Sequence, residues 1–192
     1  MIVVHPNDPS TRMLAMIYEG MEGVTLFDSW KQRKEILEAI AAAPKDEPIL
    51  ILGHGTPHGL LDMRYGYVIC DADAELLKDR PNLVGIWCYA SDYAHDHGLR
   101  GFFSGMFISE EPEAWVNGVD AGEEEINDRA WDFAGRFGGL LREGRPLAEA
   151  AAELMDPRHR DSELTEFNYS RLTWRPCGDE PLPAASRDGE PR

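Results

Sequence analysis

Short runs of consecutive apolar residues recur along the chain and are separated by longer segments of mixed character. These runs lie at residues 2–4, 24–27, 49–52, 83–87 and 106–109, and a further one lies at 169–174. Consecutive aliphatic positions are typical of strands that are buried on both faces of a parallel sheet. The pattern therefore predicts five strands of this kind and a sixth strand near the end of the sequence.

The segments between these runs predict helices, because apolar residues recur there at intervals of three and four. Ser10 is in position to cap a helix over residues 11–19. Ser29 followed by Gln32 has the form of a capping box and predicts a second helix directly after it.

The strongest helical pattern extends from residue 123 to residue 144, with three glutamates at its start and a glycine at its end. Pro146 is placed to begin a further helix. The rest of the pattern predicts a hairpin over 60–69, a short helix around 76–77, and an irregular polar stretch over 89–98.

Strands and helices thus alternate along the chain, and no internal repeat is present. This order predicts one α/β domain over residues 1–175, a three-layer αβα sandwich around a mainly parallel, flavodoxin-like sheet. Four of the final 17 residues are prolines and none is aromatic. Residues 176–192 are therefore expected to form a disordered, Pro-rich acidic tail.

The composition narrows the choice of partners. The 192 residues include 19 lysines and arginines against 35 aspartates and glutamates, a formal net charge of −16. Nucleic acids and anionic membranes attract positive surfaces, so neither is expected as a partner. No apolar stretch approaches the roughly 20 residues that span a bilayer. Three cysteines without a CxxC pair argue against a disulfide framework, and we expect a cytoplasmic protein.

A histidine and a cysteine follow two of the predicted strands. His54 comes shortly after the run 49–52, and Cys88 follows the run 83–87. Parallel strands end at one edge of their sheet, so neighbouring strands about 4.8 Å apart would place the two side chains close together. Cys88 is then a candidate nucleophile and His54 its general base. The backbone N–H groups of Gly55 and Cys88 are candidate oxyanion donors.

The residues around this pair resemble a known family. The pieces are Ile49-Leu50-Ile51-Leu52-Gly53-His54-Gly55-Thr56-Pro57 and Leu83-Val84-Gly85-Ile86-Trp87-Cys88-Tyr89-Ala90-Ser91. They are similar to the caspase-like superfamily of cysteine peptidases, which includes caspases, metacaspases, gingipains, separases and the bacterial CHAT domain. The later segment 133–150, with its glycine turn and Ala-rich end, is similar to the CHAT pattern, so the resemblance covers about residues 1–175.

The resemblance implies a caspase-like sheet and a cysteine endopeptidase that acts through a thioester acyl-enzyme. It assigns His54 as general base and acid, Cys88 as nucleophile and Gly55 as an oxyanion donor. It implies a peptide or protein substrate. We expect no cofactor and no metal, and a regulatory protein is a further candidate partner. The chain departs from many active relatives at Ile86, where they carry an acidic residue, and lacks their glycine-rich turn after the cysteine.

Acidic residues follow other predicted strands at the same edge. Asp8 follows the first strand, and Glu110 and Glu111 follow the fifth. These carboxylates are candidates for binding a basic P1 side chain, and the alternative is that they are solvated loop residues. Asp71 or Asp73 is either a third group that orients His54 or a helix cap.

The loop after Cys88 also contains a cluster of possible metal ligands. It holds Asp92, His95, Asp96 and His97, and His58 is a further candidate ligand. Alternate residues on a loop need additional ligands from elsewhere, and nothing in the sequence requires them. We therefore expect a polar surface loop and no metal.

Three other interpretations stay open. A catalytically silent caspase-like module would bind peptides or regulate a partner with the same fold. A small α/β hydrolase with a cysteine nucleophile requires a Gly-x-Cys-x-Gly elbow and a later histidine, for which His159 is a candidate. A flavodoxin-like binding module requires a phosphate loop after the first strand, and no glycine-rich loop is found there.

Overall fold

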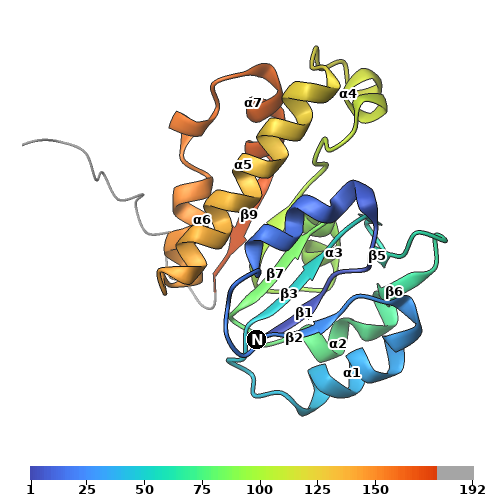
Figure 1. Ribbon diagram of the computed structural model, residues 1–192. Coiled ribbons are helices and arrows are strands. Elements are labelled where there is room, and N and C mark those ends of the chain that lie inside the picture. Colours follow the sequence, from blue (N-terminus) through green and yellow to red (C-terminus); the bar gives the residue numbers. More distant parts are fainter. Residues whose placement is uncertain (177–192) are drawn as a thin grey trace, which may run out of the picture.

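The computed structural model describes residues 1–176 and contains a mainly parallel sheet of six strands (Figure 1). The sheet order is β2-β1-β3-β7-β8-β9. The first five of these strands are parallel, and β9 pairs antiparallel with β8. Their bounds are β1 Ile2–Val4, β2 Thr25–Phe27, β3 Ile49–Leu52, β7 Leu83–Ile86, β8 Gly101–Ser104 and β9 Leu172–Arg175. The predicted α/β class with a mainly parallel sheet is confirmed.

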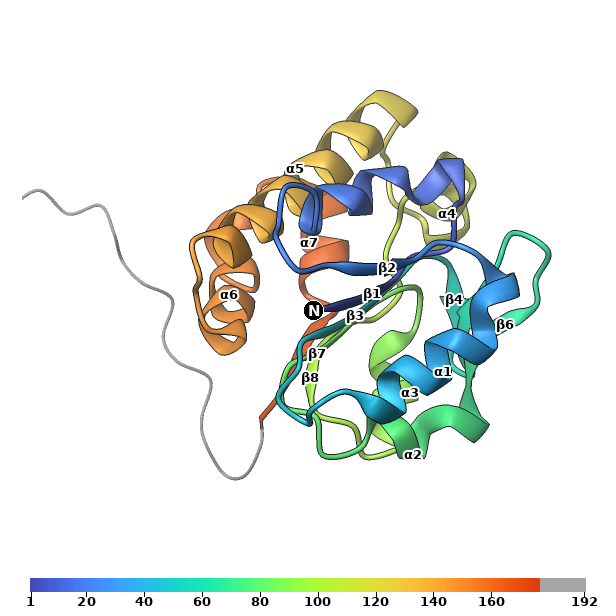
Figure 2. The same cartoon turned by 60° about the horizontal axis from the view of Figure 1, so that its bottom comes forward.

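Helices pack on both faces of this sheet (Figure 2). One face is covered by the 3-10 helix η1 and by three later helices, and the other face by three helices from the middle of the chain. The first group is η1 Pro9–Ile17, α5 Glu123–Arg142, α6 Leu147–Leu154 and α7 Glu163–Tyr169. The second group is α1 Arg33–Ala42, α2 Ala74–Leu77 and α3 Ala90–Asp96. This arrangement is compatible with the predicted three-layer sandwich.

The strand residues are buried alternately against the two helical layers, as the pleat of a strand requires. In β1, Val3 faces the layer that contains α5, whereas Ile2 and Val4 face the layer that contains α1. In β3, Leu50 and Leu52 face α5, and Ile49 and Ile51 face α1. All four residues of β3 are therefore buried, which explains its unbroken apolar sequence.

Smaller elements connect the layers. A second, antiparallel sheet follows β3 directly and consists of β4 Gly55–Thr56, β5 Gly59–Leu61 and β6 Tyr67–Cys70. The short 3-10 helices are η2 Trp30–Gln32, η3 Asp71–Asp73 and η4 Pro157–His159, and helix α4 is Glu111–Asn117. The predicted hairpin and the Ser29–Gln32 capping box are both present.

Some predicted elements were wrong. The run 106–109 is not a strand, because the backbone N–H and C=O of Ile108 bond to the side-chain amide of Asn168 instead of to a neighbouring strand. The fifth parallel strand is β8, which starts at Gly101. The stretch 89–98 contains helix α3 instead of an irregular loop, and helix α7 was not predicted.

The N-terminal helix also differs from the prediction. Its cap is Asp8, whose carboxylate accepts the Ser10 N–H at 3.0 Å, so Ser10 is not the capping residue. The predicted tail, from residue 177 onward, lies outside the described residues. No helix in residues 1–176 combines the length and the apolar character needed to cross a membrane.

Candidate active site

The parallel strands β1, β3, β7 and β8 end at one edge of the sheet. Strands β3 and β7 are direct neighbours, and Leu52 pairs with Ile86 at the end of their ladder. His54 and Cys88 therefore each lie two residues beyond the last paired position. The prediction that these two strands are neighbours is confirmed, and the register places both backbones at the same level.

The His54 ring is held by a residue from the loop after β1. The His54 Nε2 lies 2.6 Å from Ser10 Oγ, and that hydroxyl donates to Asp8 Oδ1 at 2.8 Å. The same Asp8 oxygen accepts the Ser10 backbone N–H. Asp8 was predicted to bind substrate, and in this structure its carboxylate is engaged with Ser10.

Neither carboxylate that was predicted to orient His54 contacts it. Asp71 instead accepts hydrogen bonds from His58 and His97, at 3.1 and 2.8 Å. Asp73 forms a two-pronged ion pair with Arg33, at 2.8 and 3.0 Å. The side chain that does contact the His54 ring is Ser10, which the sequence pattern indicated only as a helix cap.

The Cys88 thiol lies against a different set of groups. Its Sγ is 3.5 Å from the Phe107 carbonyl oxygen and 3.9 Å from Glu113 Oε1. Within residues 1–176, no hydrogen bond joins this thiol to His54. Burial, and after it the negative charge of Glu113, raise the pKa of Cys88 to about 12. The thiol is therefore protonated at neutral pH in this conformation.

Glu113 is fixed by the loop that leads into α4. Its Oε2 accepts the backbone N–H groups of Ser109 and Glu110 at 2.8 and 3.2 Å, and the Ser109 hydroxyl at 3.2 Å. These bonds form part of the capping box of α4. The carboxylate beside the thiol is thus a built feature of this loop and not a mobile surface group.

Gly55 lies in β4 against the indole ring of Trp87. A Cβ atom at this position would lie 2.0 Å from Trp87 Cδ1, so only glycine fits. Trp87 in turn donates from Nε1 to the Thr56 carbonyl at 3.1 Å. Within the described chain, the backbone N–H of Cys88 takes part in no hydrogen bond.

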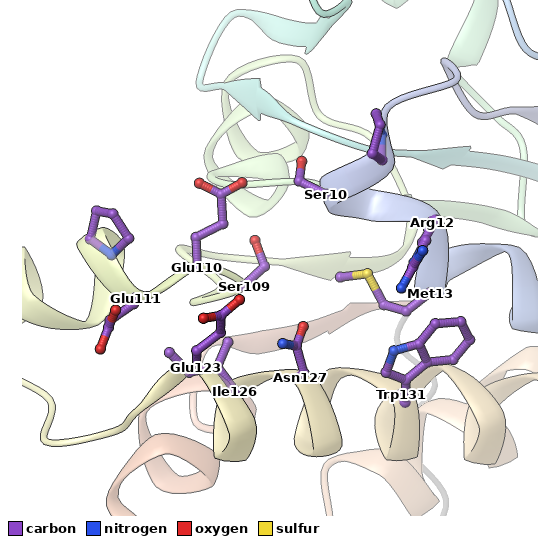
Figure 3. A pocket seen from close by; sticks show the side chains of 12 residues that line it. Ser10, Arg12, Met13, Ser109, Glu110, Glu111, Glu123, Ile126, Asn127 and Trp131 are labelled. Atoms are coloured by element: carbon purple, nitrogen blue, oxygen red, sulfur yellow. The ribbon is translucent and has the colours of Figure 1, made fainter.

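A pocket of about 590 Å³ opens beside these groups (Figure 3). Ser10, the partner of His54, lies on one side of it, and Ser109, the partner of Glu113, lies on another. Its carboxylates are Glu110, Glu111 and Glu123, against one cation, Arg12. In Figure 3, Glu110 extends toward the Ser10 side, whereas Glu111 lies farther from it. Asp8 instead lines a neighbouring hollow of about 370 Å³.

The other candidate groups lie elsewhere. The histidines His58 and His97 share Asp71, as described above, and His95 is exposed. Within residues 1–176, no group of three or more histidine, cysteine, aspartate or glutamate side chains is arranged to hold a metal ion. His159 bonds to Arg136 and to Glu153 in the α5–α6 layer.

No protein-family model, curated protein or solved structure matches this chain. The fold and the site define an α/β protein with a histidine, a cysteine and an acidic pocket at the carboxyl edge of its sheet. Its function has to be inferred from those residues.

Proposed function

We propose that the protein is a cysteine endopeptidase of the caspase-like type, with Cys88 as nucleophile and His54 as general base. One observation carries this proposal: the β3–β7 register places His54 and Cys88 at matching positions beyond two adjacent parallel strands. Activation of the cysteine requires the thiol and the imidazole to come within hydrogen-bond distance, so the proposal requires the two side chains to turn toward each other from these neighbouring strand ends. The segments that carry them are those that resemble the caspase-like superfamily.

The chemistry proceeds in two steps. The Cys88 proton passes to His54 while the sulfur attacks the scissile carbonyl carbon, and the oxygen takes up negative charge. The N–H groups of Cys88 and Gly55 donate to that oxygen. The C–N bond then breaks, protonated His54 gives its proton to the leaving amine, and a thioester remains. Water, deprotonated by His54, hydrolyses the thioester to release the acid and free Cys88.

The resting thiol has to leave Glu113 before it can react. In the described conformation it lies against that carboxylate and the Phe107 carbonyl, where a thiolate is strongly disfavoured. A turn about the Cα–Cβ bond of Cys88 moves the sulfur away from both groups. Substrate binding in the adjacent pocket is the event that we propose to favour this turn.

The pocket supports a preference for a basic P1 residue. Three carboxylates against one arginine favour a lysine or arginine side chain, and Trp131 and Met13 provide apolar surface for its aliphatic part. Glu110 and Glu111 were candidates from the sequence. Glu123 was recognised there only as the start of a helix, and its part in the pocket depends on the packing of α5.

A library of fluorogenic peptides tests this function. Peptides with Lys or Arg at P1 are expected to be cleaved, and Cys88→Ala and His54→Ala are expected to abolish turnover. The matched control is Cys70→Ala, which removes a half-buried thiol at the end of β6 and is expected to leave turnover unchanged. A preference for acidic or small P1 residues would contradict the assignment of the pocket.

One alternative is favoured by a specific observation. A catalytically silent, peptide-binding module would have no need of a thiolate, and the position of Glu113 beside Cys88 suits such a role. This alternative predicts that Lys- and Arg-containing peptides bind without being cleaved. Binding measured by calorimetry, with no product detected by mass spectrometry, would favour the silent module over the peptidase.

A further inference from the structure

The hydroxyl of Ser10 lies between a carboxylate and an imidazole, and the positions of the hydrogens follow from chemistry. Ser10 Oγ is 2.8 Å from Asp8 Oδ1 and 2.6 Å from His54 Nε2. An ionised carboxylate only accepts hydrogen bonds, and a serine has a single hydroxyl hydrogen. The hydroxyl hydrogen of Ser10 therefore lies between Ser10 Oγ and Asp8 Oδ1. The Nε2 atom of His54 must then carry a hydrogen and donate it to Ser10.

We propose that Ser10 and Asp8 are positioning residues that hold His54 in its Nε2–H tautomer. The lone pair is then on Nδ1, which has no hydrogen-bond partner among residues 1–176. This inference rests on the proposed function, in which His54 takes the proton of Cys88, and it assigns that task to Nδ1. When His54 becomes an imidazolium, its positive charge is stabilised through Ser10 by the Asp8 carboxylate.

The local backbone supports this role. Asp8 Oδ1 accepts both the hydroxyl and the backbone N–H of Ser10, so the Asp8–Ser10 turn is held by two bonds. The carbonyl oxygen of Asp8 also accepts the hydroxyl of Thr11 at 3.3 Å. Both Asp8 and Ser10 are half-buried, which limits competition from water. The same geometry argues against Ser10 as a nucleophile, because its oxygen accepts a hydrogen from His54 and does not donate one to it.

Nitrogen NMR of histidine-labelled protein tests the assignment, because the chemical shifts of the two ring nitrogens report the tautomer directly. Wild-type His54 is expected to be the Nε2–H form. Ser10→Ala and Asp8→Ala are expected to give a mixture that includes the Nδ1–H form. Asp8→Ala removes the oxygen that accepts the Ser10 hydroxyl, which frees the serine hydrogen to turn toward His54. Ser10→Thr keeps a hydroxyl and is expected to retain the wild-type tautomer.

Kinetics supply the second measurement. Ser10→Ala is expected to lower kcat about tenfold to a hundredfold with little change in KM, as part of the roughly 10²–10⁴ that a general base contributes. The matched control is Ser91→Ala, which removes a hydroxyl on α3 whose one partner among residues 1–176 is Asp92, and it is expected to leave both kcat and the tautomer unchanged.

The outcomes separate this inference from the proposed function. A wild-type Nδ1–H tautomer, or a tautomer unchanged in both Ser10→Ala and Asp8→Ala, overturns the role of Ser10 and Asp8. Wild-type protein that cleaves no peptide, but whose tautomer depends on Ser10 and Asp8, supports the positioning and overturns the peptidase.

Discussion

At the scale of single residues, the chemistry of Cys88 depends on its burial and, after that, on the carboxylate beside it. The pKa of Cys88 is raised to about 12, so its reaction with iodoacetamide is expected to be slow at pH 7. As long as the pH is below the pKa, the rate is expected to rise about tenfold for each unit by which the pH is increased. Glu113→Gln removes the charge but keeps an oxygen that can cap α4. It is expected to lower the pKa and to raise the alkylation rate at pH 8 about tenfold, since one pKa unit is a factor of ten in thiolate.

The control for this experiment is Glu111→Gln, which removes a carboxylate from the same turn of α4. The groups with the largest effects on the pKa of Cys88 do not include Glu111, and this variant is expected to react at close to the wild-type rate. Peptide mapping distinguishes Cys88 from Cys70. Equal alkylation rates in Glu113→Gln and in wild-type protein would contradict the effect assigned to Glu113.

His5, directly after β1, is expected to make folding sensitive to acid. Burial lowers its pKa from 6.5 to about 4, and its ring bonds to Tyr18 and Thr11. Between these two values the unfolded chain binds more protons, so stability decreases as the pH falls through this window. The full effect is roughly 3 kcal/mol, at about 1.4 kcal/mol per pH unit. Urea unfolding at pH 7 and pH 4.5 measures most of this effect.

His5→Gln cannot titrate, so its free energy of unfolding is expected to fall less between pH 7 and pH 4.5 than that of wild-type protein. His95→Gln changes an exposed histidine and is expected to keep the wild-type pH dependence. A His5→Gln variant with the same acid sensitivity as wild-type protein would show that His5 does not cause it.

Residue patterns singled out His54, Cys88, Gly55, Glu110 and Glu111 as candidates, because each follows an apolar run. They did not single out Glu113 or Glu123 for the site, and they considered Ser10 only as a helix cap. Ser10 contacts His54 because β1 and β3 are adjacent strands, and local periodicity does not predict the order of strands in a sheet. Glu113 meets Cys88 because the α4 loop folds back, which depends on long-range contacts such as that between Ile108 and Asn168.

At the scale of elements, the approach of β8 to β7 depends on one glycine. Gly101 has a φ of +131°, and a Cβ atom there would lie 2.0 Å from the Leu83 carbonyl oxygen. Gly101→Ala is therefore expected to destabilise the protein by about 3 kcal/mol or more, through backbone strain and overpacking. At Gly139 in α5, no neighbouring atom lies within 4 Å of the place that a Cβ would occupy, so Gly139→Ala is expected to stabilise the helix by roughly 0.5–1 kcal/mol.

Denaturant unfolding of both variants measures these changes. The change in the free energy of unfolding is expected to have opposite signs in the two variants. There is no space for a Cβ atom at Gly101, whereas at Gly139 an alanine only improves the helix propensity. If Gly101→Ala were as stable as wild-type protein, the close β7–β8 pairing would be contradicted.

The elements that sequence patterns identified best are those with the longest apolar signal. Strand β3 has four aliphatic residues, and α5 has a long repeat of buried positions, so both were located. The fifth strand was predicted too late in the sequence. Strand β8 has the sequence Gly-Phe-Phe-Ser with only two apolar side chains, whereas the unpaired segment after it contains Phe107 and Ile108, which are also buried. Burial alone does not distinguish a strand from a packed loop.

At the scale of the whole molecule, the net charge of −16 and the acidic pocket point in the same direction. A strongly acidic protein attracts basic peptides over distances of about a Debye length and repels acidic ones. The three carboxylates of the pocket would then select a basic side chain at P1. Together they connect the composition of the chain to the proposed substrate class.

The most direct test of the central claim is the labelling of Cys88 by a peptidyl acyloxymethyl ketone with Lys or Arg at P1, followed by intact-mass and peptide-mapping mass spectrometry. The account predicts one label per chain, at Cys88, formed in wild-type protein and in Cys70→Ala but not in His54→Ala or Cys88→Ala. An unlabelled Cys88, or labelling that is undiminished in His54→Ala, would contradict the claim that these two residues form a catalytic pair.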